Sequence, residues 1–191
     1  MASWTITTYF MSWNTSAVLI KSKIGEQPER LFEALGFPNA KFVRSVSFDE
    51  AASSRSPGRA LAVSKDWTAI FDPQAFGLFA DAPIADGFLP ALLEQRLAAL
   101  SRQAEVFGFM LAGTSSTAAF THFVGGKRVR CLLMQEGAPA IDIGTPSEIE
   151  TAVLSEDPDM EDAVFSIAKR LGFDLFTEPH PQYSLFSFAK S

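Results

Sequence analysis

The residues of this chain whose types could do nucleophilic chemistry are one cysteine, Cys131, and two histidines. A β-hairpin that turns at Gly125-Gly126 would place His122 opposite Val129 and Phe120 opposite Cys131. His122 and Cys131 then become diagonal neighbours on one face of the sheet, because opposite residues share a face. A thiol beside an imidazole can lose its proton and become a nucleophilic thiolate.

The apolar residues expected around this pair argue against a reactive thiol. Phe120, Val129 and Leu133 fall on the same predicted face as His122 and Cys131. Burial raises the pKa of a thiol and lowers that of an imidazole, so it suppresses the ion pair. We therefore expect an inert, buried core at these five positions, and a cysteine enzyme is the alternative.

The opposite face of the same hairpin carries Arg128, Arg130, Thr121 and Phe123. Two arginines beside an exposed aromatic ring can hold a carboxylate or a phosphate through paired hydrogen bonds. Arg128, Arg130 and Phe123 are therefore candidate ligand-binding residues. The alternatives are a solvated strand face, or internal pairing with the acidic C-terminal helices.

An acidic segment runs from residue 142 to residue 178. Lys169 and Arg170 are its basic residues, and its ten carboxylates are Asp142, Glu148, Glu150, Glu156, Asp157, Asp159, Glu161, Asp162, Asp174 and Glu178. Such a surface either keeps a protein soluble or binds a basic partner protein. Glu161 and Asp162 fall away from the apolar stripe of a predicted helix, so they are candidate partner-binding residues.

Several function classes find no support in the sequence. It lacks a Gly-x-Ser-x-Gly elbow and a glycine fingerprint, and Gly113–Thr117 lacks the lysine of a phosphate loop. One cysteine and two histidines cannot build a Cys/His zinc site, so we expect neither metal nor cofactor. The formal net charge of −6 disfavours nucleic-acid binding. No catalytic residue is assigned, and the sequence favours a protein that is not an enzyme.

The sequence also favours a cytoplasmic protein. Residues 1–10 lack the basic flank and apolar core of a secretory signal. No apolar run approaches the roughly 18 residues that a membrane-spanning helix needs.

The elements that must position these residues are clearest in the second half of the chain. Periodicity and helix-end signals predict helices at 89–100, from Thr145, and at 158–171, with strands at 105–112, 120–124, 127–134, 140–143 and 183–189. The apolar stripe of helix 158–171 should dock it on the sheet through Val164, Ile167 and Leu171.

The first half gives weaker signals. They predict strands at 4–13 and 17–20 around a turn at Asn14–Ser16, a helix at 28–35 ended by Gly36, a strand at 41–48, and one or two strands within 60–72. Residues 73–83 read as a connection without periodicity.

Together these elements predict an α+β fold. A mostly antiparallel sheet of two hairpin-rich groups should be covered on one side by three or four helices. The chain, 1–191, reads as a single domain, with a division into halves 1–83 and 84–191 as the alternative. Its 18 phenylalanines indicate either a Phe-packed core or an aromatic-lined ligand cavity.

One stretch carries a resemblance. The run His122–Arg130, the helix start Gly144–Glu148 and the helix end Leu171-Gly172-Phe173 together resemble uncharacterised bacterial proteins with domains of unknown function. The resemblance covers about residues 105–175. It implies a bacterial source, and it carries no activity and no catalytic residue.

Three hypotheses about function follow from the sequence. The first is a non-enzymatic, soluble binding or interaction protein, such as a bacterial accessory or partner-neutralising protein, that uses its acidic C-terminal helices. The second is a small-ligand-binding protein with a Phe-lined cavity and arginine anchors. The third is an enzyme that lacks any recognisable motif.

Overall fold

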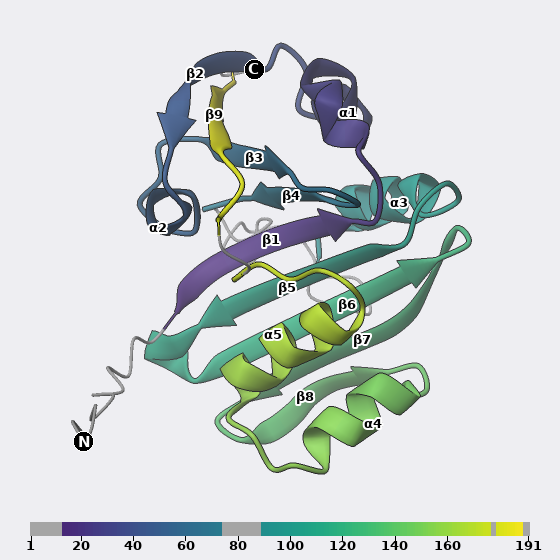
Figure 1. Ribbon diagram of the computed structural model, residues 1–191. Coiled ribbons are helices and arrows are strands. Elements are labelled where there is room, and N and C mark those ends of the chain that lie inside the picture. The colour runs from purple at the N-terminus through teal and green to yellow at the C-terminus, as the bar shows by residue number, and fades with distance from the viewer. Residues whose placement is uncertain (1–12, 74–88, 177–178, 189–191) are drawn as a thin grey trace, which may run out of the picture.

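The computed structural model describes residues 13–73, 89–176 and 179–188. Its strands form one nine-stranded sheet with the order β2-β9-β3-β4-β1-β5-β6-β7-β8, and each pair of neighbouring strands is antiparallel (Figure 1). The strands are β1 (Asn14–Ile20), β2 (Lys41–Val46), β3 (Arg59–Val63), β4 (Thr68–Phe71), β5 (Val106–Ala112), β6 (Thr117–Val124), β7 (Lys127–Gln135), β8 (Ala138–Ile143) and β9 (Tyr183–Ser187). This sheet confirms the predicted α+β fold with antiparallel pairing.

Five α-helices lie in the described residues. They are α1 (Pro28–Ala34), α2 (Phe48–Ala51), α3 (Ala91–Leu100), α4 (Glu148–Leu154) and α5 (Met160–Arg170). Short 3₁₀ turns occupy Ile24–Glu26 and Gly113–Ser115. No helix in these parts of the chain combines the length and the apolar character that crossing a bilayer requires.

Two strands join the halves of the chain into one sheet. The first strand, β1, pairs with β4 on one side and with β5 on the other. The last described strand, β9, lies at the end of the sheet far from β8, between β2 and β3 (Figure 1). The sheet region of β2, β3 and β4 therefore includes β9 from the end of the sequence as well as β1 from its start.

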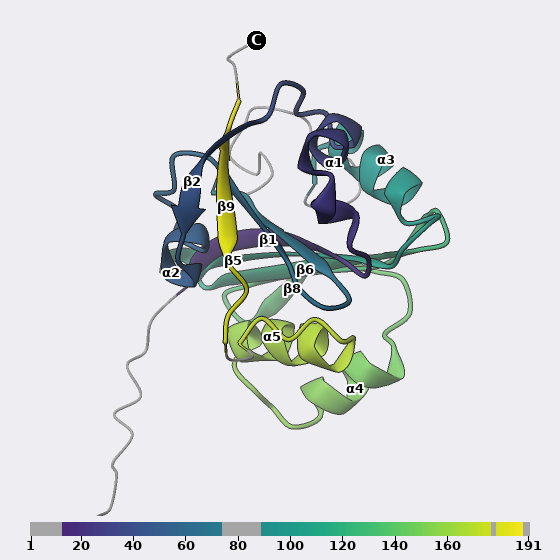
Figure 2. The same cartoon turned by 45° about the horizontal axis from the view of Figure 1, so that its top comes forward.

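Helices cover both faces of the sheet, so the expectation that they cover one side is wrong. Figure 2 shows α1 and α3 on one face, called here the α3 face, and α4 and α5 on the other, called the α5 face. A separate hydrophobic core fills each face. The central strand β5 is apolar throughout, and β1 is buried from Thr15 to Ile20. Strands buried in this way need cover on both faces.

The predicted turn at Asn14–Ser16 is wrong, because these residues begin β1. The backbone N–H of Asp72 donates to the Ser16 carbonyl, and the Ser16 hydroxyl donates to the Asp72 carbonyl. These tertiary bonds hold polar residues in an extended strand, against their local turn preference. The predicted strand 4–13 and the connection 73–83 lie outside the described residues, apart from Trp13 and Pro73.

Several other element ends differ from the prediction. Strand β2 stops at Val46, because Ser47 caps the start of α2 by accepting a hydrogen bond from the Glu50 N–H. Helix α4 is capped by Ser147 and α5 by Asp159, each two residues beyond the predicted cap. The prolines at 146 and 158 point to Thr145 and Asp157 as the caps. The caps are instead Ser147 and Asp159, whose side chains accept hydrogen bonds from the backbone N–H groups of Glu150 and Glu161.

Candidate functional site

A β-bulge decides which residues of the β6–β7 hairpin face each other. The turn at Gly125-Gly126 forms as predicted, with both glycines at positive φ. His122 faces Arg130 rather than Val129, because Val129 is an extra residue in β7 that has no partner in β6. The prediction that His122 faces Val129 is therefore wrong.

The bulge moves His122 and Cys131 to opposite faces of the sheet, so they are not neighbours. Cys131 packs in the core of the α3 face with Phe123 and Leu133, whereas the neighbour of His122 is Phe107 on the α5 face. Cys131 is buried as predicted. Phe123, expected to be exposed, is fully buried, and Val129, expected to be buried, is 41% exposed. The geometry of a cysteine–histidine pair is absent from this hairpin.

His122 instead belongs to a charged network at the C-terminal end of α5. Its Nε2 lies 2.8 Å from Glu105 Oε1, and Lys21 Nζ lies 3.2 Å from Glu105 Oε2. Lys21 also donates a hydrogen bond of 3.1 Å to the carbonyl of Leu171. A cation at this place stabilises the last turn of the helix.

The buried Arg130 side chain forms all of its hydrogen bonds with groups of the protein itself. Its Nε donates to both carboxylate oxygens of Glu150, at 3.0 and 2.9 Å, and its Nη2 donates to Glu150 Oε1 at 2.7 Å. Its Nη1 donates to Asp142 and to the carbonyls of Ile143 and Gly144. Burial alone lowers the pKa of the Arg130 guanidinium, but the bonds to Glu150 and Asp142 outweigh burial and raise it. This arrangement matches the alternative of internal pairing with a C-terminal helix.

The other candidates from the hairpin lie on the α3 face. Arg128 Nη1 donates a 2.7 Å hydrogen bond to Glu94 of α3, and Phe123 is buried beneath. The structure therefore does not bring Arg128 and Phe123 together with Arg130. Glu161 and Asp162 lie elsewhere, in the first turn of α5.

Helix α5 docks on the sheet as its apolar stripe predicts. Val164 and Ile167 are buried with Ala163 and Ala168 on the helix face that contacts β5 and β6. Leu171, the third predicted docking residue, caps the helix and packs against the same core while partly buried. The helix ends at the predicted glycine, where the Phe173 N–H donates to the Ala168 carbonyl at 2.9 Å. Phe165 lies off this stripe and remains only partly covered.

Glu161 anchors the start of the described chain to α5. The Trp13 backbone N–H donates to Glu161 Oε2 at 3.2 Å. Burial is the main cause that raises the pKa of Glu161 above its ordinary value, and the nearby carboxylates of Asp159 and Asp162 add to it. The hydrogen bond from Trp13 acts in the opposite direction.

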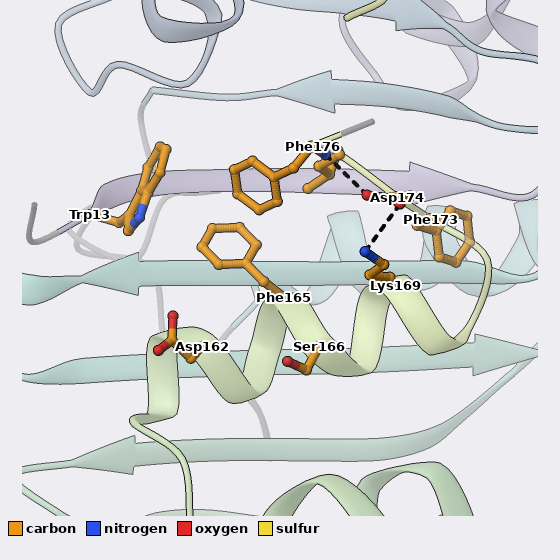
Figure 3. A pocket seen from close by; sticks show the side chains of 9 residues that line it. Trp13, Asp162, Phe165, Ser166, Lys169, Phe173, Asp174 and Phe176 are labelled. Atoms are coloured by element: carbon orange, nitrogen blue, oxygen red, sulfur yellow. Dashed lines mark hydrogen bonds and ion pairs between the residues drawn. The ribbon is translucent and has the colours of Figure 1, made fainter. Parts of the chain in front are cut away.

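A pocket of about 390 Å³ opens beside Trp13, between α5 and residues 173–176 (Figure 3). Its apolar lining is Trp13, Phe165, Phe173, Leu175 and Phe176, and its polar lining is Asp162, Ser166, Lys169 and Asp174. We call it the α5 pocket. Its volume falls in the lower part of the range for ligand sites, roughly 300–1,000 Å³.

Three aromatic rings form one wall of the α5 pocket. The Phe165 ring centroid lies 5.5 Å from that of Trp13 and 5.0 Å from that of Phe176, both with edge-to-face geometry. Phe48 continues the cluster behind them, 5.6 Å from Phe176. Edge-to-face pairs of this kind are favourable contacts, and Phe176 remains 45% exposed.

The two ends of the pocket differ in charge. Lys169 Nζ pairs with Asp174 at 3.4 Å, and Arg170 outside the pocket pairs with Glu156 at 2.7 Å. Both basic residues of the acidic segment are thus engaged. Figure 3 shows Asp162 at the Trp13 end of the pocket, away from the Lys169–Asp174 pair. Within the described residues, no cation pairs with Asp162.

Sequence reasoning missed the α5 pocket, because it joins residues 13, 162–169 and 173–176 through tertiary packing. Asp162 was the one lining residue among the candidates. One local signal was present, since Phe165 is an aromatic residue outside the apolar stripe of its helix. No group of three or more His, Cys, Asp or Glu side chains in the described part of the chain is placed to hold a metal ion.

Comparisons of the chain with protein-family models, with curated proteins and with solved structures find no match.

Proposed function

We propose that this protein is a non-enzymatic binding protein whose α5 pocket receives a basic segment of a partner protein. One observation carries the proposal: the pocket joins the exposed ring of Phe176 and the half-buried rings of Trp13 and Phe165 to a carboxylate, Asp162, for which the described residues supply no cation. Aromatic rings surrounded by polar residues are the usual anchor points of protein interfaces.

The charges around the pocket support a basic partner. Asp157, Asp159 and Asp162 gather at the N-terminal end of α5, and the neighbouring Glu161 is held by the Trp13 N–H. Lys169 and Arg170 are already paired with Asp174 and Glu156. A field of uncompensated carboxylates attracts a basic segment and speeds its association.

The experiment uses a defined probe and the full chain. The probe is an acetylated and amidated pentapeptide with leucine, arginine and leucine between two glycines, and the matched control replaces arginine by glutamate. We expect amide chemical shifts in α5 and the indole shift of Trp13 to change with the basic peptide alone. Equal binding of both peptides, or binding of neither, would overturn the proposal.

Two variants locate the binding to the pocket. Asp162→Asn should weaken binding of the basic peptide, whereas Glu148→Gln removes one exposed carboxylate from α4, outside the pocket, and should leave binding unchanged. Phe176→Ala should weaken it too, since Phe176 exposes nearly half of its ring. Equal effects of Asp162→Asn and Glu148→Gln would point to general charge attraction without a site.

A second candidate function is the binding of a small molecule in the same pocket. The aromatic lining and the volume of the pocket favour it. Arg128 and Arg130 do not line the pocket, so they do not anchor such a ligand there. A small aromatic amine, phenethylamine, tests it: saturable binding without binding of the basic peptide would favour the second candidate.

A further inference from the structure

We infer that the side chain received by the α5 pocket is an arginine rather than a lysine; this inference rests on the proposed function. The guanidinium would lie against the aromatic wall of the pocket, where Phe176 is exposed and Trp13 is half-buried, with Asp162 as its carboxylate partner. Three features of the chain point to this occupant.

The first feature is the aromatic lining. Trp13, Phe165 and Phe176 pack edge to face, and Phe176 keeps 45% of its surface exposed. A planar guanidinium stacks on an aromatic ring. A lysine ammonium is a compact and strongly hydrated charge, so it gives up more hydration to enter an aromatic site.

The second feature is Asp162, the carboxylate that lines the Trp13 end of the pocket. The Asp162 side chain is exposed, and no Lys, Arg or His of the described residues forms an ion pair with it. A free carboxylate can accept two parallel N–H bonds from one guanidinium, a geometry that an ammonium cannot match.

The third feature is that the protein contains a comparable set of groups, aromatic rings and a carboxylate, with an arginine bound to it. On the α3 face, the Arg59 Cζ lies 3.6 Å from the centroid of the Phe37 ring and 5.0 Å from that of Phe188. Arg59 Nε also donates a 3.0 Å hydrogen bond to Asp72. Within the described part of the chain, Arg59 is the cation that stacks on aromatic rings, and no lysine does so.

The Asp72, Phe37 and Phe188 set and the Asp162, Trp13 and Phe176 set thus share one chemistry: aromatic rings beside one carboxylate. In the first set the guanidinium comes from the chain itself. In the second, the described lining of the pocket contains no arginine, and Lys169 is paired with Asp174 at the other end, so we assign the guanidinium to the partner.

The test compares three pentapeptides that differ at the central residue alone: arginine, lysine, and citrulline, the uncharged isostere of arginine. Affinities for the full chain are measured by titration calorimetry and by amide shifts of α5. We expect the lysine peptide to bind about fivefold more weakly than the arginine peptide, with citrulline weaker still.

Each outcome separates the two proposals. Equal affinities for arginine and lysine overturn the arginine inference and leave the basic-partner function standing. Equal affinities for arginine and citrulline overturn both, because charge would then contribute nothing, and binding of none of the three also overturns both. Asp162→Asn should abolish the difference between arginine and lysine, and Glu148→Gln should preserve it.

Discussion

The guanidinium of Arg130 in β7 and the carboxylate of Glu150 in α4 form a buried ion pair with three hydrogen bonds between them. The pair ties the first turn of α4 to the sheet. It exists because the Val129 bulge turns Arg130 toward the α5 face.

Removal of one partner of this pair should strongly destabilise the fold. Arg130→Met leaves the Glu150 carboxylate buried without its cation, which should lower the free energy of unfolding by about 3–5 kcal/mol. The double variant Arg130→Met with Glu150→Leu should recover most of that loss, and urea melts measure both. If the double variant is no better than the single one, the pair is not what makes Arg130→Met costly.

The hydroxyl of Tyr183 should be a stability defect. It is buried beside Phe48 and Phe71 and has no hydrogen-bond partner in the described structure. Tyr183→Phe keeps the ring and removes the unsatisfied group, so it should raise the free energy of unfolding by about 1 kcal/mol. Tyr183→Leu, which loses the ring, is the control that should destabilise. A loss of stability in Tyr183→Phe would mean that the hydroxyl is hydrogen-bonded.

The same tyrosine should make the fold sensitive to alkali. Burial raises the pKa of the Tyr183 phenol well above its ordinary value of 10.0. The neutral phenol therefore contributes stability that is complete below that ordinary value and is lost as the pH rises toward the folded-state pKa. Urea melts across this alkaline range should show a steeper loss for the native chain than for Tyr183→Phe.

Helix α5 should separate core from surface effects cleanly. Ile167→Ala opens a cavity in the core of the α5 face and should cost about 2–5 kcal/mol. Asp162→Lys reverses an exposed charge and should change stability by less than about 0.5 kcal/mol. A large loss from Asp162→Lys would mean that this carboxylate is paired internally and does not serve a partner.

Glu161 gives a second pH dependence. Because burial raises its pKa in the folded protein, the ionised carboxylate is disfavoured there, and its ionisation lowers stability as the pH rises through that pKa. Glu161→Gln can still accept the hydrogen bond from Trp13. Its stability relative to the native chain should therefore increase from below the ordinary value of 4.5 up to neutral pH, whereas Glu148→Gln should show no such trend.

Two glycines with the same positive φ of 86° provide a matched pair. At Gly36 a Cβ would meet the mobile guanidinium end of Arg96, so Gly36→Ala should cost the backbone strain alone, about 1–2 kcal/mol. At Gly144 it would lie 2.1 Å from the Val129 carbonyl oxygen, which is fixed backbone. Gly144→Ala should therefore cost clearly more in a denaturant melt; equal costs would show that the bulge yields.

Local signals predicted the elements of this fold well, because they depend on neighbours in sequence. Gly36 ends α1, Gly125-Gly126 turns the β6–β7 hairpin, and Ile167 lies on a buried stripe, as predicted. The bulge at Val129 could not be predicted in this way. It follows from contacts with residue 144 and α4, which lie beyond the hairpin.

The α5 pocket escaped prediction for a related reason. Trp13 and Phe176 are far apart in sequence, and no periodicity links them. Arg128 and Arg130 were adjacent by sequence pattern, yet the one-residue shift at Val129 sends them to opposite faces, where Glu94 and Glu150 bind them. The face of the sheet on which a strand residue lies depends on the register, and a single extra residue moves the residues beyond it to the other face.

The position of β9 between β2 and β3 sets an order for folding during synthesis. Among the strands that the structure describes, β2 pairs with β9 alone, and residues 41–46 are translated long before residues 183–187. Until β9 leaves the ribosome, β2 lacks the strand with which it pairs in the described structure, and the backbone edge of β3 that pairs with β9 is open. Pairing across so many residues closes a long loop and is slow. The nascent chain therefore waits with an unpaired sheet edge, which is the state in which chaperones bind and aggregation begins.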